Sequence, residues 1–392
     1  MYKHIFNYLV ASSLLLSLPA IADTANVNLY GVANVSYDII NTGIAATGTQ
    51  GSNIAKASSN ASRIGFKGSE NLGDGLSAKW QIETLVLLDN SSNSCAAVAA
   101  GSAVPNCTAN NGIFATRNSY ASLGSKDYGS LLIGRYDTPY KITTRKLDNF
   151  ADSIADNRSL FGSVSSVSAS KSYVTKQPDV FSYSSPNMNG FTVSVAQVNL
   201  AETATTDAAA KASATSYSTM YEAGNLYSAL AYETHKLDTV RAGASESAWV
   251  ASLRYTLEDF SLAAAYESSS DTLGKAASLT SCSALTAGAN CLGHTSTYLT
   301  GKYTFGSNAL KLAYTKTSSL SSANNTGANQ ISLGYDHRVS KRNTLYAIYT
   351  KLTNETLAKY NLGSSSFSSA ATTAIGAGSS LSAISFGLKQ VF

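Results

Sequence analysis

The chain has 392 residues and a formal net charge of +4, and only 13% of its residues are charged while 44% are hydrophobic. Low charge combined with little Leu, Ile and Val bulk argues against a large soluble core. No apolar run beyond the N-terminal segment approaches the ~18 residues of a transmembrane helix, which argues against a helical membrane protein. No Pro-rich joint or charge run marks a domain boundary, and the charge balance gives no reason to expect a nucleic-acid partner.

The N-terminal segment has the features of a secretory signal peptide. It has a single Lys3, an apolar run from Tyr8 to Leu18, and the small-residue motif Ala-Ile-Ala directly before Asp23. The apolar run is shorter than the ~20 residues that a bilayer-spanning helix needs. We therefore expect residues 1–22 to be a signal peptide and residues 23–392 to form one exported domain.

Four cysteines lie in two polar stretches. Cys95 and Cys107 share one stretch, and Cys282 and Cys291 share the other, so each pair could close a local disulfide in an oxidising compartment. The pairing cannot be deduced from the sequence, and free thiols remain an alternative. Because there is no CxxC motif or Cys/His cluster, we expect neither a metal site nor a cofactor.

Most of the mature chain alternates polar and apolar residues with a period of two, as β-strands do. In residues 247–257, for example, Trp249, Leu253 and Tyr255 share one face, and Val250 and Arg254 lie on the other. A short Glu-Asp turn separates this strand from the next. Approximate strand spans are 26–40, 59–70, 75–89, 114–124, 128–136, 172–185, 190–199, 216–223, 225–236, 247–257, 259–268, 296–305, 308–317, 329–339, 343–352 and 380–392.

The segment 146–158, KLDNFADSIADNR, departs from this alternation. Its acids Asp148, Asp152 and Asp156 are spaced by four residues, which places them on one side of a helix. Its apolar residues lie on the other side: Leu147, Phe150 and Ile154. The pattern predicts one short amphipathic helix within an otherwise all-β protein.

Strands with one apolar face suit either a soluble sandwich or a transmembrane barrel, in which the apolar face contacts lipid. Short turns such as LEDF and FGSN alternate with long polar loops, which is the asymmetry expected between the two rims of an outer-membrane barrel. Tyrosines gather near strand ends, as in an interfacial aromatic girdle. We therefore predict an all-β protein, a transmembrane antiparallel β-barrel.

The C-terminal strand places Ile384, Phe386, Leu388 and Phe392 on one face. A strand that ends on an aromatic residue, here Phe392, resembles the signal read by the bacterial outer-membrane assembly machinery. Gln390 departs from that pattern, because an apolar residue is usual at its position.

Several stretches resemble signatures of the Gram-negative general porins, especially the neisserial and betaproteobacterial type. They are ASRIGFKGSENLGDGLSAKWQIE, TRNSYASLGSKDYGSLLIGRYDTPY, FSYSSPNMNGFTVSVAQ and SLGYDHRVSKRNTLYAIYT, in that order along the chain. The N-terminal VNLYGVANVSYD resembles the first porin strand, with Asn34 where aspartate is commoner. The resemblance covers the whole mature chain.

This resemblance implies a barrel of about sixteen strands in the outer membrane of a Gram-negative bacterium, assembled as a homotrimer. Each barrel would be a water-filled channel for passive diffusion of small hydrophilic solutes and ions. Its other partners would be outer-membrane lipid, lipopolysaccharide and the assembly machinery. In such porins the loop after the fifth strand folds inward and narrows the channel, and the segment 146–158 follows that strand.

We accordingly expect Asp148, Asp152 and Asp156 to line the constriction, with the apolar side of the helix packed on the inner wall. A basic wall should oppose the acids: Arg63, Lys67, Lys79, Arg117 and Arg135. Arg63 and Arg117 are assigned by resemblance, and Lys67 and Lys79 because they fall on polar strand faces. The Arg135 side chain points into the lumen only if its strand has already ended, because alternation would otherwise place it on the same face as Leu131 and Ile133. Two alternatives remain open: the acids could be ordinary solvated loop charges, and the bases could line the barrel wall without taking part in a constriction.

Other functions fit the sequence less well. The mature histidines, His235, His294 and His337, have no catalytic motif around them, so we do not expect an enzyme. A substrate-specific channel or a surface-loop adhesin is the alternative, and the long loops near 90–112, 270–295 and 354–379 could serve either. The small positive net charge suggests a mild preference for anions.

Overall fold

The computed structural model describes residues 26–89, 115–162, 173–200, 213–236, 245–271, 292–363 and 375–392. The segment expected to be a signal peptide and all four cysteines lie outside these ranges, so cleavage and disulfide pairing stay predictions. Within the described ranges, no group of three or more His, Cys, Asp and Glu residues could hold a metal ion. Neither helix in these ranges is both long and apolar enough to cross a bilayer.

Strands dominate the described residues, and one α-helix and one 3-10 helix interrupt them. In chain order the elements are β1 (Asn26–Asn41), β2 (Asn53–Ser59), β3 (Arg63–Gly73), β4 (Leu76–Leu85), β5 (Ser119–Ser125), β6 (Gly129–Asp137), α1 (Pro139–Arg145), η1 (Asn157–Ser159), β7 (Lys176–Ser184), β8 (Phe191–Asn199), β9 (Ser213–Ala223), β10 (Leu226–Lys236), β11 (Ser245–Leu257), β12 (Phe260–Asp271), β13 (Thr295–Phe305), β14 (Asn308–Thr317), β15 (Ala328–Arg338), β16 (Asn343–Asn354) and β17 (Ser380–Val391).

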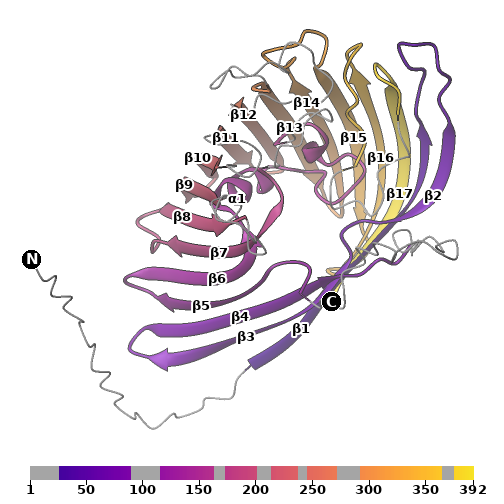
Figure 1. Cartoon of the computed structure of the whole chain (residues 1–392). Helices are drawn as coiled ribbons and strands as arrows, with labels where there is room; N and C mark the ends of the chain where they lie inside the picture. Colours follow the sequence, from indigo (N-terminus) through magenta and orange to yellow (C-terminus); the bar gives the residue numbers. More distant parts are fainter. Residues whose placement is uncertain are drawn as a thin grey trace, which may run out of the picture.

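The described strands form one antiparallel sheet that closes on itself, because β17 pairs with β1 (Figure 1). Both β2 and β3 pair with β1, so they are two parts of a single barrel strand. The seventeen segments therefore make a closed barrel of sixteen strands, as predicted. Closure removes the free edges that an open sheet would expose in a membrane.

The break between β2 and β3 was not predicted. The sequence predicted one strand from residue 59, but the strand paired with β1 begins at Asn53, ends at Ser59 and resumes at Arg63. Ala61 has a φ of 53°, which leaves the extended region of backbone space. The period-two pattern does not reveal such a break because the alternation resumes after it.

The two faces of the barrel differ as the alternation predicts. Leu253, Leu262 and Leu312 point outward and are 51%, 66% and 53% exposed in the isolated chain. Val250 and Ala265 point inward and are buried. A large apolar outer surface is stable only against lipid, which supports the transmembrane barrel over the soluble sandwich.

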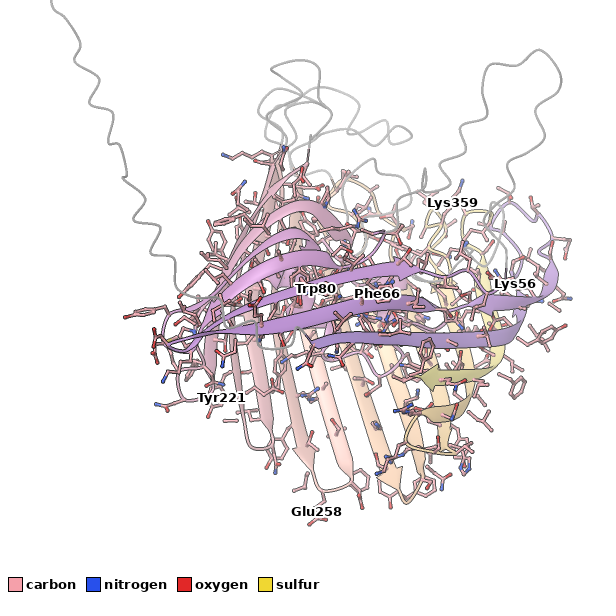
Figure 2. All side chains as sticks on the ribbon, turned by 90° about the horizontal axis from the view of Figure 1, so that it is seen from below. Lys56, Phe66, Trp80, Tyr221, Glu258 and Lys359 are labelled. Atoms are coloured by element: carbon pink, nitrogen blue, oxygen red, sulfur yellow. The ribbon has the colours of Figure 1, made fainter. Side chains whose placement is uncertain are left out.

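The two rims of the barrel also differ. Figure 2 shows Glu258, in a tight turn, at one rim and Lys359, in a long loop, at the other. Near the short-turn rim the ring of Phe260 stacks on Tyr303 with centroids 4.4 Å apart, and Tyr303 stacks on Phe305. Aromatic rings at this level fit the predicted interfacial girdle.

A packed core fills part of the barrel interior. The connection between β6 and β7 is described over residues 138–162 and 173–175, and these residues turn into the lumen. We call it the inward loop. Figure 1 shows α1 of this loop inside the ring of strands, and α1 contacts β8, β9, β10 and β11. The fold thus places a short helix within the barrel, as predicted.

Candidate pore constriction

The helix of the inward loop lies earlier in the chain than the sequence pattern indicated. It spans Pro139–Arg145, and the segment 146–158 that was predicted to be helical forms turns that end in η1. Thr138 starts the helix because its hydroxyl accepts a hydrogen bond from the Lys141 amide, and proline is favoured at the first helical position.

The three acids of the loop explain why their segment is not a helix. Asp148 accepts hydrogen bonds from the amides of Phe150 (2.8 Å) and Asn157 (3.2 Å), and Asp156 accepts one from the Asp152 amide (2.9 Å). Asp152 itself has a φ of 57°. Aspartate side chains that bond nearby amides compete with helical hydrogen bonds, and three like charges spaced by four residues disfavour a helix further.

The apolar side of the segment packs against the wall, as expected. Leu147, Phe150 and Ile154 are buried to 2% exposure or less and join the core with inward residues of the barrel. The Phe150 ring lies against Gly334, where a Cβ atom would come within 2.7 Å of it. The Lys311 ammonium stands 4.9 Å from the centre of the same ring. This packing holds the loop across the lumen.

Hydrogen bonds that are buried or partly buried also tie the loop to the wall. The Tyr140 hydroxyl donates to Glu267 (2.6 Å), and the Tyr298 hydroxyl donates to Asp148 (3.0 Å). Asn149 donates to the hydroxyl of Thr300 (2.9 Å). Because Glu267, Tyr298 and Thr300 belong to β12 and β13, these bonds attach the loop to one side of the barrel.

The acids are paired mainly with two arginines of their own loop, which the sequence interpretation missed. Arg145 lies 3.3 Å from Asp148, 2.6 Å from Asp152 and 3.0 Å from Asp156. Arg158 lies 2.7 Å from Asp156 and 3.5 Å from Asp152. The sequence did contain a signal for these pairs, because both arginines lie close to the acids along the chain and Arg145 precedes Asp148 by three residues.

Burial and these partners move the pKa values of the acids apart. Burial, with Asp156 close by, raises the pKa of Asp148 to about 6. Burial would also raise the pKa of Asp156, but Arg145 and Arg158 outweigh it and hold that pKa well below its usual range. For Asp152, Arg145 and Arg63 outweigh burial and lower the pKa. Asp148 is therefore the acid of the row that gains a proton most easily.

Of the predicted bases, Arg63 is the one that reaches the acidic row. Its guanidinium is 3.4 Å from Asp152 and 3.6 Å from Glu83. Arg117 pairs with Glu83 at 2.6 Å, and the Tyr30 hydroxyl donates to the same carboxylate. Glu83 on β4 was not predicted, and it shares its negative charge between Arg63 and Arg117.

The other predicted bases lie apart from the acids. Lys67 and Lys79 are exposed, on stretches of β3 and β4 nearer the short-turn rim, and the Lys67 ammonium stands 5.1 Å from the centre of the Tyr30 ring. Arg135 donates from Nε to the backbone oxygen of Thr116 at 3.1 Å. The pairing of β6 with β7 shifts next to Arg135, so simple alternation does not hold there.

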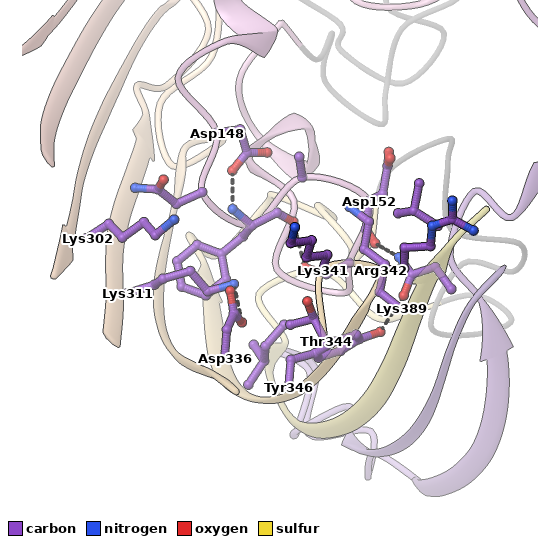
Figure 3. A pocket seen from close by; sticks show the side chains of 17 residues that line it. Asp148, Asp152, Lys302, Lys311, Asp336, Lys341, Arg342, Thr344, Tyr346 and Lys389 are labelled. Atoms are coloured by element: carbon purple, nitrogen blue, oxygen red, sulfur yellow. Dashed lines mark hydrogen bonds and ion pairs between the residues drawn. The ribbon is translucent and has the colours of Figure 1, made fainter. Parts of the chain in front are cut away.

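A second set of bases, which was not predicted as a group, faces the tip of the inward loop. A cavity of about 450 Å³ lies between them and the loop, and Asp148, Asp152 and Asp336 also line it (Figure 3). We call these bases the lysine wall: Lys302, Lys311, Lys341, Arg342 and Lys389. Lys311 pairs with Asp336 at 2.7 Å. Within the described part of the chain, the other four form no ion pair.

These features define a class of protein. A closed barrel with an apolar outer face, and with a charged loop folded into its lumen beside a cavity lined by charged side chains, is a membrane channel. A family model described as Gram-negative porin matches residues 9–357, so the chain belongs to the Gram-negative porin family. The protein is therefore a channel of the bacterial outer membrane through which solutes diffuse passively.

Solved structures agree on the fold. An anion-selective porin from Comamonas acidovorans is 20% identical with a TM-score of 0.72, and the match covers 94% of this chain and all of that one. OmpT of Vibrio cholerae is 11% identical with a TM-score of 0.62 over 95% of this chain and 99% of its own. OmpF of Salmonella typhi is 15% identical with a TM-score of 0.58 over 94% and 98%. A search among curated proteins finds no match.

Proposed function

We propose that this porin passes small hydrophilic anions in preference to cations, through the cavity between the inward loop and the lysine wall. The observation that carries this proposal is the imbalance of unpaired charge. Five bases and three acids line the cavity. Arg145 binds Asp148 and Asp152, and Lys311 binds Asp336, whereas the other four bases form no ion pair with any of the described residues. Unpaired bases attract anions into a narrow lumen.

The bases predicted from the sequence extend this path in our proposal. Lys67 and Lys79 would add positive charge toward the short-turn rim, where both are exposed. Arg63 and Arg117 would contribute less than a full charge each, because Glu83 lies between them. Asp148, Asp152 and Asp156 would narrow the passage without making it cation-selective. The porin of Comamonas acidovorans to which the chain is similar is anion-selective, which agrees with the proposed preference for anions.

The test is the reversal potential of the purified channel in a planar bilayer under a KCl gradient. We expect a reversal potential of the sign that anion flux produces. Replacing Lys302 and Lys389 together with glutamine should move it toward zero, whereas Lys126→Gln, in an exposed turn outside the lumen, should leave it unchanged. A wild-type reversal potential of cationic sign would contradict the proposal.

The alternative is a substrate-specific channel. Conductance measurements in the same planar bilayer distinguish it from a general porin. Conductance that rises in proportion to salt concentration indicates a general porin. Conductance that saturates, and that one solute blocks, indicates a specific channel. The adhesin alternative depends on the long loops near 90–112, 270–295 and 354–379, most of which lie outside the described residues.

We also propose that the protein works as a homotrimer in a bilayer of outer-membrane lipid and lipopolysaccharide, delivered by the outer-membrane assembly machinery. The resemblance to general porins supports this, as does the terminal Phe392 on the lipid-facing side of the last strand, where it is 46% exposed. Conductance steps that open and close in groups of three would agree with it, and a monomeric mass in mild detergent would contradict it.

A further inference from the structure

The tip of the inward loop meets the barrel wall at the unpredicted strand break. Between β2 and β3, the amide of Asn60 donates to the backbone oxygen of Asn34 on β1 at 2.7 Å. The amide of Asn34 in turn donates to the hydroxyl of Ser62 at 2.9 Å. The break is therefore built around Asn34, which is 2% exposed.

The Asn34 side chain joins three parts of the molecule. Its Nδ2 donates to the backbone oxygen of Asp152 in the inward loop at 2.9 Å and to that of Asn60 at 3.1 Å. Its Oδ1 accepts a hydrogen bond from the Tyr346 hydroxyl at 2.9 Å. Asn60 donates to the same hydroxyl at 3.0 Å. Each hydrogen of the Asn34 amide group thus serves one backbone carbonyl.

The hydrogen bond from Asn34 reaches Asp152, whose carboxylate contacts one arginine of the loop and one of the barrel wall. Asp152 has a positive φ, and its carboxylate is held by Arg145 and lies 3.4 Å from Arg63. The same residue lines the cavity opposite the lysine wall. Moving its backbone would move both the carboxylate and the edge of the passage.

We propose that Asn34 is a positioning residue that fixes the tip of the inward loop against the wall and so sets the width of the passage and the place of the Asp152 carboxylate. An amide can do this at any pH, because its two donors do not titrate. A carboxylate of the same shape would turn oxygen toward two carbonyl oxygens and add a negative charge near Asp152. The inference concerns the width of the channel and holds whichever ion the channel prefers.

The decisive variant is Asn34→Asp, studied by single-channel recording. Ionised, it offers no donor to Asp152, so the fraction of time that the loop tip is undocked should rise about 5- to 150-fold, the factor that corresponds to ~1–3 kcal/mol for unsatisfied buried carbonyls. At about pH 8 we therefore expect noisier current and an altered conductance. At about pH 5, burial favours the protonated acid, which donates one hydrogen bond, and the current should return toward the wild type.

Two further variants keep the test specific. Asn34→Ala has no donor at any pH, so its current should be noisy at both pH values, which separates a donor effect from a general disturbance. Asn41→Asp, at the exposed end of the same strand, should behave as the wild type. Resistance of the folded barrel to SDS at room temperature checks assembly of each variant.

A wild-type current in Asn34→Asp at about pH 8 would overturn the inference, and so would the same pH response in Asn41→Asp. If Asn34→Asp fails to assemble, Tyr346→Phe replaces it. That variant removes the hydrogen bond to Asn34 Oδ1 and should raise the current noise by a smaller factor. Unchanged noise in an assembled Tyr346→Phe channel would then overturn the inference.

Discussion

Asp148 occupies an unusual place among the charges of the lumen. Its carboxylate is buried between Arg145 and the Tyr298 hydroxyl, yet the same residue lines the cavity in front of the lysine wall. Arg158 and Arg145 hold Asp156 ionised, while burial favours the protonated form of Asp148. One loop therefore contains acids that respond differently to pH, although their spacing in the sequence is uniform.

The ion selectivity should therefore depend on pH through Asp148. A carboxyl group with a raised pKa loses its negative charge as pH falls through that value, so the cavity becomes more positive and anion preference should increase below about pH 6. The measurement is the reversal potential in a salt gradient from about pH 8 to pH 5. Asp148→Asn should show the low-pH value throughout, and Asp259→Asn, in an exposed turn, should keep the step. A step that persists unchanged in Asp148→Asn would assign it to another group.

At the scale of elements, the inward loop is held mainly by packing and by bonds to the wall. Regular secondary structure contributes little, because α1 has only seven residues and the rest of the described loop is turns and a 3-10 helix. A helix this short is marginal by itself. The position of the loop inside the lumen therefore depends on the contact of Phe150 with Gly334 and on the hydrogen bonds to β12 and β13.

Truncating Phe150 should loosen the loop without opening the barrel. Removing a phenyl ring that is 1% exposed destabilises the packing by about 3–5 kcal/mol. We expect Phe150→Ala channels to show larger current fluctuations and faster proteolytic cleavage within residues 146–156 in the assembled protein. Phe386→Ala is the matched control, because that ring is 55% exposed on the outer face. Equal cleavage rates in the two variants would argue against the role given to Phe150.

The sequence predicted this element in part. Periodicity correctly assigned Leu147, Phe150 and Ile154 to the buried side, since apolar side chains in a polar loop must find an apolar partner. The same periodicity wrongly predicted a helix over 146–158. Aspartates have hydrogen-bonding alternatives to the helix, and whether they take them depends on the amides that come within reach, which spacing does not reveal.

At the scale of the whole molecule, the barrel closes where its two ends meet. The amide of Gly31 donates to the Phe392 carbonyl at 2.9 Å, and the Phe392 amide donates to the Gly31 carbonyl at 3.1 Å. The Phe392 ring covers Gly31 so closely that a Cβ atom there would lie 2.4 Å from it. This close approach gives the glycine a structural role at the seam between β1 and β17.

Gly31→Ala should weaken that seam. The added methyl group would also lie 2.8 Å from the backbone oxygen of Arg63, so the wall must shift, and overpacking of this kind costs about 1–3 kcal/mol. We expect the temperature at which the folded barrel converts to the denatured electrophoretic form to fall. Gly301→Ala is the control, because its methyl group would meet only the tip of Leu262 at 3.3 Å. An unchanged transition temperature in Gly31→Ala would contradict this account of the seam.

The sequence by itself determined which strand residues face lipid and which face the lumen, because the alternation of faces is a local property of each strand. Leu253 and Leu312 face outward and Val250 inward as their positions require. Only the tertiary structure decided which charges meet. Ion pairs act over a few ångströms, and Lys302, Lys389 and Asp152 come together around the cavity from distant parts of the chain. The spacing of the acidic row predicted that its carboxylates face the pore. In the structure they pair largely with Arg145 and Arg158 of their own loop, because those two arginines lie within ion-pair distance.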